Sequence, residues 1–566
     1  MKPFAWSVYC GLAVSGLAST LAVAAEQQPK LVLQITVDQL RGDFLDRNRQ
    51  HFGDGGFRYL LDSGTVFTNA HHRHANTETI VGHVTLATGT DPAIHGMVAN
   101  LWFDRKEGAP HYNVQDARYP LVGEGGVDQS TELDPTQRAA TTDGRSPSAI
   151  LTSTLADEIS IGISNGSKVF GVSVKDRGAI SMAGHTGTAY WFSKSDASFI
   201  SSTYYMDDYP AWVREWNAAG HVSAYAGTSW TLADSGESYR FADADDMEWE
   251  TDFPGFGRAF PHPYGEAEGD RFFTTRLTLG PAGDVLTAEF AKALIDAEDI
   301  GSDAVTDYLS VSFSSTDYVG HIFGPSSLET EDNLRHLDRT LAGLLAHVDE
   351  KVGLDNTLIV LSADHGAAEV PGYLRSIGID AHYFDFEAAD KGPAIAALKS
   401  EFGIAEELIE SFSNPYVYLD RDVIAQRGLD FDRVARRVAS ELADMPGIAF
   451  AVSSADLRAG AVASTSISEA VLANFHASRS GDIYIVFEPH WFIGDMDGLT
   501  VAGAHGSPWS YDTHVPIILA GPGITAQRVY RRVETVDLAP TVAAYLRIKA
   551  PSGTRGRILT EALPQP

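Results

Sequence analysis

Cysteine is almost absent from the sequence, whose 566 residues include only Cys10. One cysteine cannot form a disulfide within the chain, so core packing and any bound metal must stabilise the fold. Cys10 also follows the bulky Tyr9, whereas lipoprotein signals place a small residue before their cysteine. We therefore expect neither a disulfide nor lipidation.

Positive charge is also scarce. The 42 Lys and Arg residues face 75 Asp and Glu residues, which gives a formal net charge of −33. This acidity disfavours nucleic acid or an anionic membrane as a partner. It would also repel an anionic substrate, so a site for one needs its own concentrated positive charge, for which metal ions are the obvious source. A saline habitat would explain the acidity equally well.

Long apolar runs suited to a leader are confined to the N-terminus. Lys2 precedes an apolar run over residues 6–23, and small residues end it just before Glu26. This pattern predicts a secretory signal peptide over residues 1–25. Serines and a threonine weaken the run as a membrane anchor, and the small-residue end favours cleavage. We expect a periplasmic or secreted protein with no stable membrane anchor.

The rest of the chain alternates between strand and helix patterns. Continuous apolar runs typical of buried strands occupy residues 30–37, 168–174, 307–313, 356–361 and 515–520. Helical patterns occupy residues 148–159, 288–297, 330–351, 431–443 and 536–546. This order predicts an α/β fold, in which helices sandwich a mostly parallel central sheet.

Three segments depart from the alternating pattern. We expect residues 104–147, 194–270 and 367–499 to be insertions in one catalytic domain of residues 26–566. The first is rich in Gly, Asp, Pro and Thr and is interpreted as irregular surface. The second includes the acidic run FADADDMEWETDF, which lacks the ligand spacing of a known Ca²⁺ loop and is interpreted as a solvated face. The second and third insertions would form cap segments.

Thr79 lies in the stretch HANTETIVGHVTLATGT, just ahead of an apolar run spaced like a short helix. A hydroxyl there would lie at the positive end of a helix, which is suited to receive an anion. Gly82 would allow another segment to approach closely. Threonine needs a base or a metal ion to act as a nucleophile, so the simpler interpretation of these residues alone is an N-cap.

Carboxylate and imidazole groups follow the ends of several predicted strands, where ligands lie in open α/β sheets. Six such groups come from four distant segments: Asp38, Asp317, His321, Asp364, His365 and His505. The pair at 317 and 321 would share one face of a helical turn. The adjacent pair at 364 and 365 would need the chain to turn at Gly366. Although a lone Asp38 is also a common helix cap, six groups allow two sets of three zinc ligands around the Thr79 oxygen.

Three further residues could bind an oxyanion. Asn100 can donate from its amide, and Lys175 and Arg177 could converge on one anion if the preceding strand continues. Ordinary turn chemistry and a solvated charged turn are the alternatives for these residues.

Taken in order, seven motifs resemble the alkaline phosphatase superfamily. They are TVDQLR at Asp38, TIVGH from Thr79, HGMVAN ending at Asn100, KDR from Lys175, TDYVGH around Asp317, SADHG at Asp364 and HGSPWSYDTHVP from His505. Within the superfamily the chain is similar to the exported bacterial phosphate-irrepressible alkaline phosphatases that use a threonine nucleophile. Their core is related to the nucleotide pyrophosphatase/phosphodiesterases. Each motif is weak alone, whereas the ordered set is highly specific.

The resemblance implies a role for each of these residues. One zinc would be held by Asp317, His321 and His505, and a second by Asp38, Asp364 and His365. Thr79 would bridge toward the second zinc as the nucleophile. The non-bridging phosphoryl oxygens would be contacted by Asn100, Lys175 and Arg177. The chain shows no motif for the Mg²⁺ site of the serine-type enzymes, and Lys175 and Arg177 could supply that charge.

The implied activity is hydrolysis of small-molecule phosphate monoesters through a covalent phosphothreonine, with release of inorganic phosphate. Lys and Arg match the doubly charged phosphoryl group of a monoester, whereas a diester places a second substituent there. The alternative is a phosphodiesterase or nucleotide pyrophosphatase on the same two-zinc scaffold. A sulfatase or phosphonate hydrolase would need a C/S-x-P-x-R context, which is absent around Thr79. A non-enzymatic phosphate-binding or zinc-storage protein also remains open, as do the natural substrate and the oligomeric state.

Overall fold

A computed structural model describes residues 28–123, 132, 134–163, 166–496 and 499–564. The signal peptide expected over residues 1–25 lies outside them. No helix within the described ranges combines the length and the apolar character needed to cross a bilayer.

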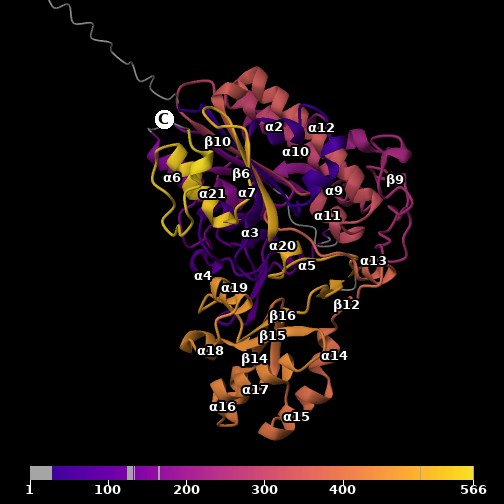
Figure 1. Cartoon of the computed structure of the whole chain (residues 1–566), viewed down its shortest axis with the longest axis vertical. Helices are drawn as coiled ribbons and strands as arrows, with labels where there is room; N and C mark the ends of the chain where they lie inside the picture. The colour runs from indigo at the N-terminus through magenta and orange to yellow at the C-terminus, as the bar shows by residue number, and fades with distance from the viewer. Residues whose placement is uncertain (1–27, 124–131, 133, 164–165, 497–498, 565–566) are drawn as a thin grey trace, which may run out of the picture.

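A ten-stranded sheet forms the centre of the larger lobe (Figure 1). Five neighbouring strands pair in parallel, in the order β6 (Thr188–Ser193), β5 (Val169–Ser173), β10 (Asp307–Phe313), β1 (Leu31–Val37) and β11 (Thr357–Ser362). On the β11 side follow β20 (His514–Ala520), which is antiparallel to its neighbours, then β2 (Thr65–His71) with β21 (Gln527–Val529) and β22 (Val533–Glu534). The antiparallel β7 (Ser198–Ile200) closes the other edge. The expected mostly parallel α/β sheet is confirmed.

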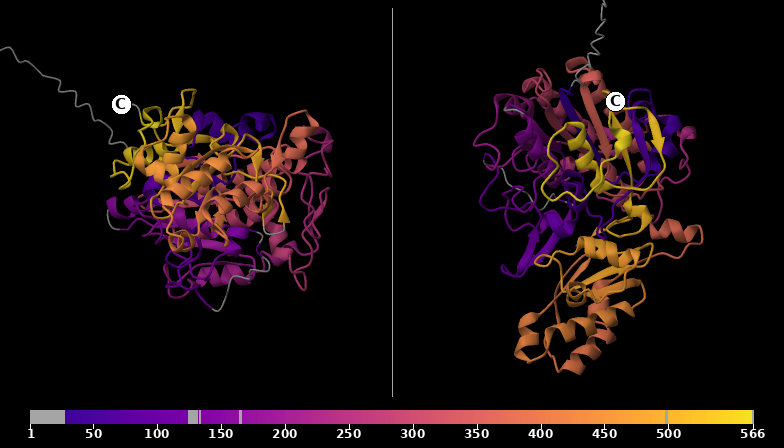
Figure 2. Two further views of the ribbon diagram at one scale, coloured as in Figure 1. Left: turned by 90° about the horizontal axis from the view of Figure 1, so that it is seen from below. Right: turned by 60° about the vertical axis from the view of Figure 1, so that its left-hand side comes forward.

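Helices cover both faces of this sheet. Along β1, Leu33 and Ile35 pack in one apolar cluster with α10 (Pro281–Ala297) and α12 (Leu328–Lys351). Val32, on the opposite face, packs with α6 (Leu155–Gly162) and α21 (Leu538–Tyr545). Every residue of β1 is buried, which explains why its sequence is continuously apolar instead of alternating. The result is a helix–sheet–helix sandwich, which forms the upper part of the molecule in the right-hand view of Figure 2.

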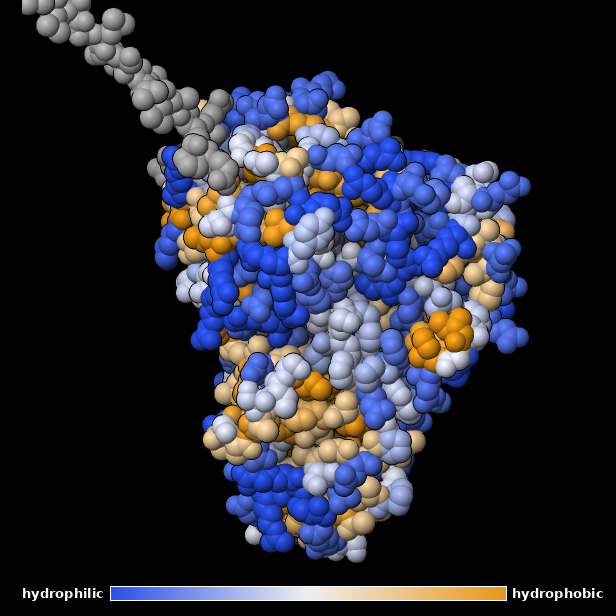
Figure 3. Space-filling model, viewed as in Figure 1, coloured by the Kyte–Doolittle hydropathy of each residue, from blue (hydrophilic) through white to orange (hydrophobic). Residues whose placement is uncertain are grey.

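A smaller lobe is built from residues within 367–499 and is drawn in orange at the bottom of Figure 1. Its antiparallel sheet has the order β13 (Ile409–Ser413), β14 (Tyr416–Leu419), β16 (Ile483–Phe487) and β15 (Ile448–Ser453). Helices α15 (Pro393–Phe402), α16 (Arg421–Gln426) and α17 (Phe431–Ala443) pack on it around a separate apolar cluster. The face shown in Figure 3 is largely hydrophilic over the larger lobe, as the net charge suggests.

Two expectations from the sequence are wrong. The helix expected over residues 148–159 begins only at Leu155, because Thr154 caps it and forms a capping box with Asp157. Residues 104–147 were expected to be irregular surface, yet Tyr112 and Arg145 are almost fully buried. The strand β3 (Leu101–Asp104) leads into this segment, which contains its hairpin partner β4 (Ala109–Tyr112) and the short helix α5 (Pro135–Arg138). It therefore contributes to the core beside the strand ends.

Candidate active site

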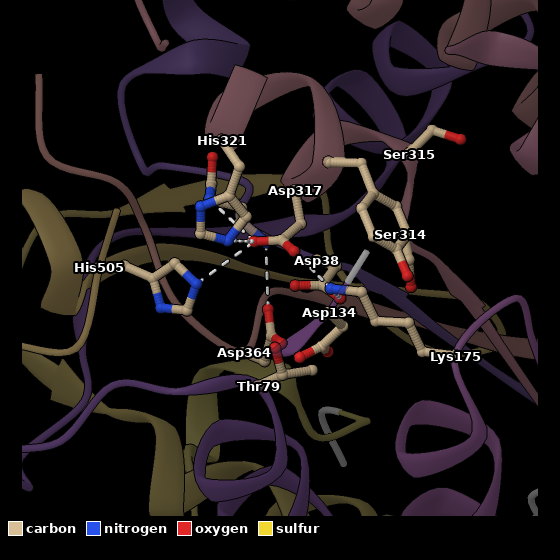
Figure 4. Close-up of polar contacts among 12 residues, drawn as sticks. Asp38, Thr79, Asp134, Lys175, Ser314, Ser315, Asp317, His321, Asp364 and His505 are labelled. Carbon is tan, nitrogen blue, oxygen red and sulfur yellow. Dashed lines mark hydrogen bonds and ion pairs between the residues drawn. The ribbon is translucent and has the colours of Figure 1, made fainter. Parts of the chain in front are cut away.

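Buried acidic and imidazole side chains meet at the carboxyl ends of three neighbouring strands (Figure 4). Asp38 follows β1, Asp317 lies on α11 (Ser315–Ile322) after β10, and Asp364 follows β11. Since these strands are parallel and adjacent, their carboxyl ends lie at one edge of the sheet. His505 reaches the same place from the loop before α20 (Ser510–Thr513), the short helix that leads into β20.

Asp38, Asp364 and His365 form one group in which three ligand atoms lie within 4.8 Å of one another. The Nε2 atom of His365 is 3.4 Å from Asp38 Oδ1 and 3.4 Å from Asp364 Oδ2. All three atoms are buried and make no hydrogen bond of normal geometry to the described part of the chain. The other oxygen of each carboxylate does accept a hydrogen bond, and the Oδ2 atom of Asp364 lies 3.0 Å from His83 Nδ1. Buried carboxylate oxygens and an imidazole nitrogen that make no hydrogen bond are donors that a metal ion would satisfy.

Asp317, His321 and His505 form a second group beside the first, and Asp317 lies at its centre. Its Oδ1 atom lies 3.3 Å from the Nε2 atoms of both His321 and His505. Asp317, His365 and His505 also form a group whose ligand atoms lie within 4.8 Å of one another. The rings of His365 and His505 stack with centroids 3.6 Å apart, so the two groups are contiguous. The six residues singled out from four segments are thus brought together.

The three histidines are oriented alike. Each donates its Nδ1 hydrogen to a backbone carbonyl: His321 to Gly503 at 2.8 Å, His365 to Gly366 at 2.9 Å and His505 to Thr77 at 2.9 Å. A carbonyl can only accept, so in the neutral ring the lone pair is on Nε2, the atom that faces the carboxylates. This arrangement fixes the tautomer that metal ligands need.

Lys175 lies between the two groups. Its ammonium donates to Asp38 Oδ2 at 2.7 Å and to Asp317 Oδ2. Burial raises the pKa of Asp317, but the charges of Lys175 and His321 outweigh it and lower the pKa overall. Burial opposes protonation of His365, yet the charge of Asp364 raises its pKa to about 9. The buried carboxylates are therefore stabilised by positive charge. Divalent cations would supply more of it in the same space than the single charges of Lys175 and the histidines.

Thr79 is the first residue of α3 (Thr79–Thr88), and Glu78 occupies the N-cap position. The simple N-cap interpretation of Thr79 is therefore wrong. Its Oγ1 atom instead accepts a hydrogen bond from Arg177 Nη2 at 3.3 Å. Thr79 lines a cavity of about 510 Å³ together with Asn100, Arg177 and the histidines at 321 and 505. The hydroxyl thus faces a space that is large enough for a small ester.

Gly82 lets α3 approach the loop that carries Asp364, as the sequence suggested. A Cβ atom at this position would lie 1.9 Å from the carbonyl oxygen of Asp364. Gly366 serves a similar purpose, because a Cβ there would lie 2.1 Å from the carbonyl oxygen of Tyr511. Close packing, not a left-handed turn, explains both glycines.

Substitution Gly82→Ala should therefore damage both stability and activity. The added methyl must push Asp364 away, and overpacking of this kind costs about 1–3 kcal/mol. Thermal unfolding and hydrolysis of a monoester measure the two effects. Gly343→Ala on α12 is the control, because no atom lies within 4 Å of its added methyl. Equal behaviour of the two variants would contradict the proposed close contact.

Lys175 and Arg177 converge, though not for the expected reason. The strand ends at Ser173, and Lys175 is the N-cap of α7 (Asp176–Ala183), so the first helical turn presents both cations. Asn100 accepts the Ile80 N–H through Oδ1 at 3.1 Å, which leaves its NH₂ group as a donor beside the cavity. Asn100 and Arg177 thus line the cavity beside Thr79, whereas the Lys175 ammonium is directed to Asp38 and Asp317.

Several supporting residues were missed from the sequence. Asp134 accepts from Arg177 Nη1 at 2.5 Å, although it belongs to the segment interpreted as irregular surface. Gln39, directly after Asp38, has a φ of 65° and donates from Nε2 to Asp317 Oδ1 at 2.8 Å. An Asp-Pro pair at 134 and 135 signals a helix start, but only the tertiary fold reveals what Asp134 contacts.

The chain is similar to known proteins over most of its length. The model of the type I phosphodiesterase / nucleotide pyrophosphatase family matches residues 32–508. The chain is 34% identical over 555 residues to alkaline phosphatase PafA of Elizabethkingia meningoseptica, with 98% of each chain covered. It is 34% identical to alkaline phosphatase PhoV of Synechococcus elongatus, covering 95% of this chain and 93% of that protein.

The fold leads to the same relatives. A crystal structure of wild-type PafA matches with a TM-score of 0.85 and 33% identity, covering 95% of this chain and 99% of that one. The resemblance inferred from the ordered motifs is thereby confirmed. The chain belongs to the type I phosphodiesterase/nucleotide pyrophosphatase family, within which it groups with the PafA-like alkaline phosphatases.

Proposed function

We propose that this protein is a zinc-dependent alkaline phosphatase that hydrolyses small-molecule phosphate monoesters through a phosphothreonine at Thr79. Its family and its alkaline phosphatase relatives support the reaction class. The observation that carries the mechanism is the position of the Thr79 hydroxyl, which contacts Arg177 and opens onto a cavity shared with Asp317 and His505.

The residues fit two zinc ions. Asp317, His321 and His505 would hold one, and Asp38, Asp364 and His365 the other. Nitrogen and carboxylate oxygen are the donors that catalytic zinc sites use, with three protein ligands each. When bound, the ions would supply the positive charge that stabilises the Thr79 alkoxide and the oxygen of the departing alcohol.

The side chains of the protein would position the phosphoryl group for two displacements. The Thr79 oxygen forms a bond to phosphorus as the alcohol leaves in line, and water then releases inorganic phosphate from Thr79. Asn100, Lys175 and Arg177 would hold the three non-bridging oxygens. The N-terminus of α3 adds its partial positive charge at the same atom.

The second candidate function is diester hydrolysis on the same scaffold. Phe412, Phe492 and Ile493 line the cavity and offer apolar surface to a second substituent. We favour monoesters, because Arg177 and Lys175 are both buried cations at the site and match a doubly charged phosphoryl group.

We also propose the domain organisation and location that the sequence suggested. Residues 1–25 would be a cleaved signal peptide that exports the protein, and residues 26–566 one catalytic domain. The segments 104–147, 194–270 and 367–499 would be insertions. Phe412 and Asn414 of the third line the cavity, so this insertion would shape substrate access.

A chelation experiment tests the proposed function against its rivals. Hydrolysis of an aryl phosphate monoester should disappear in the presence of a strong chelator and return when zinc is added. The same preparation should act less well on the matching aryl diester. Activity that survives removal of all metal would contradict the zinc requirement, and a protein that binds phosphate without turnover would be a non-enzymatic member of the family.

Asp134 should act as a positioning residue for Arg177. Burial raises the pKa of Asp134, but the charge of Arg177 has the opposite effect and the net pKa lies below the usual value. The carboxylate is therefore ionised and anchors the guanidinium. Substitution Asp134→Asn should lower kcat/KM for monoesters by roughly 10-fold through misplacement of Arg177, with a smaller effect on diesters. Asp143→Asn, an exposed site in the same segment, is the control. An equal loss on both substrates would refute a role through Arg177.

A further inference from the structure

Gln39 has an unusual backbone conformation. It directly follows Asp38 at the end of β1 and has a φ of 65°, in the left-handed region. Glycine adopts this region freely, and asparagine and aspartate tolerate it, whereas a longer side chain is strained there. Gln39 is also only 2% exposed. A strained and buried glutamine at this strand end indicates that its side chain has a task beyond closing the turn.

Gln39 contacts one carboxylate of each candidate zinc group. Its Nε2 atom donates to Asp317 Oδ1 at 2.8 Å, and its backbone N–H donates to Asp364 Oδ1 at 3.1 Å. Both aspartates are buried. Because the two aspartates belong to different groups, the side chain and the backbone of this one residue span the whole metal centre.

The bond from Gln39 helps to orient the Asp317 carboxylate. Oδ1 is the oxygen that lies 3.3 Å from the Nε2 atoms of both His321 and His505 (Figure 4). The other oxygen, Oδ2, accepts a hydrogen bond from the Lys175 ammonium. With a donor on each oxygen the carboxylate is held against rotation, so Oδ1 stays directed toward the two histidines. Hydrogen bonds of this kind fix the orientation of metal ligands.

Gly320 provides the space that the Gln39 amide occupies. It lies on α11, between Asp317 and His321 in the sequence. A Cβ atom at Gly320 would lie 1.7 Å from Gln39 Oε1, and the three atoms nearest to it all belong to the Gln39 side chain. The helix that carries two of the candidate zinc ligands therefore has a notch that fits this amide.

We propose that Gln39 is a positioning residue for the metal centre. Its amide orients Asp317 for one zinc, and its backbone N–H orients Asp364 for the other. This inference rests on the proposed two-zinc function. Glycine at this turn would relieve the strained backbone and keep the N–H, but it would lose the amide. The need for the amide therefore accounts for a glutamine at a position whose φ favours glycine.

Two substitutions separate the amide from the backbone and from packing. Gln39→Gly relieves the strained φ and keeps the N–H, whereas Gln39→Met keeps an unbranched side chain of similar length without the donor. The full-length proteins are loaded with zinc and titrated with a competing chelator, and zinc per chain is measured. The parent protein should hold two ions. Both variants should bind one of them roughly 10–100-fold more weakly and the other as the parent does.

Each alternative role of Gln39 gives a different result. If the residue only shaped the backbone, Gln39→Gly would bind both ions like the parent. If it only filled space, Gln39→Met would do so. Either outcome would overturn the proposal, as would equal weakening of both ions. A parent protein that retains no zinc would instead contradict the proposed function itself.

Asp299→Gly is the control for relief of a positive φ. Asp299 has a φ of 51° and is exposed. Its carbonyl accepts a hydrogen bond from Lys168, which lies just before the amino end of β5 and so at the other end of the sheet. The affinity for both ions should stay that of the parent.

Gly320→Ala tests the same contact from the other side. The added methyl should displace the Gln39 amide and weaken the same zinc by a similar factor. In the Gln39→Gly background the methyl has no amide to displace, so the double variant should bind zinc no more weakly than Gln39→Gly alone. Gly343→Ala, with no atom within 4 Å of its added methyl, is again the control. Additive losses in the double variant would refute a common action through Asp317.

Anomalous scattering at the zinc edge identifies the ion that is lost. Crystals of Gln39→Gly and of the parent are grown at the same limiting zinc concentration. The position beside Asp317, His321 and His505 should have a lower occupancy in the variant than in the parent. The position beside Asp364 should remain as filled as in the parent. Loss at the second position with the first one intact would contradict the proposal.

Discussion

Substitution Thr79→Ala should remove nearly all turnover, by roughly 10⁴-fold or more, because loss of a covalent nucleophile eliminates the first displacement. The substitution removes the hydroxyl and one methyl group, and Thr79 makes no side-chain cap bond on which α3 depends. The folded protein and its bound metal should therefore persist. Steady-state hydrolysis of an aryl phosphate monoester, with metal content measured in parallel, gives the result.

Thr88→Ala is the matched control for this variant. Thr88 lies on the same helix and donates to the Val84 carbonyl at 2.6 Å, away from the cavity. Its substitution removes one hydroxyl from α3 and should leave kcat nearly unchanged. Turnover by Thr79→Ala within tenfold of the parent would mean that water attacks the substrate directly.

Substitution Arg177→Ala should lower monoester hydrolysis on the order of 100-fold and largely spare diesters. Arg177 is buried, contacts the Thr79 hydroxyl and is anchored by Asp134, so it is already placed where charge develops. Loss of one such preorganised donor costs about 10²–10³ in rate. A diester carries one charge fewer and places a substituent where the guanidinium would bind. The ratio of kcat/KM for aryl monoester and diester substrates measures the difference.

Arg118→Ala controls for the loss of an arginine at the surface, since Arg118 pairs with Asp116 and is largely exposed. It should change neither activity. If Arg177→Ala lowered both activities equally, the guanidinium would serve general binding and the preference for monoesters would need another origin.

The strand pattern could be predicted from the sequence because the central sheet is buried on both faces. Continuous apolar runs such as residues 307–313 have few other interpretations, and β10 has those bounds. The metal-binding candidates followed from the same logic, since Asp38 and Asp364 stand at strand ends that the sheet brings together. The sequence also predicted that another segment would approach Gly82 closely, but it did not predict that this segment would be the backbone at Asp364.

Side-chain partners from irregular segments could not be predicted. Asp134 contacts Arg177 although the two residues are 43 positions apart in the chain. The spacing of apolar residues in the sequence does not predict such a contact. Lys175 and Arg177 were expected to share a strand face, whereas a helix begins at once and turns both inward. In each case tertiary packing, not local pattern, decides the role.

The stereochemistry of phosphoryl transfer tests most directly whether Thr79 carries the phosphate. A monoester made chiral at phosphorus with oxygen isotopes is turned over by the zinc-loaded protein, and the configuration of the product is determined. Two in-line displacements through phosphothreonine each invert the centre, so the configuration should be retained. Inversion would show a single displacement by water or acceptor and would contradict a covalent role for Thr79.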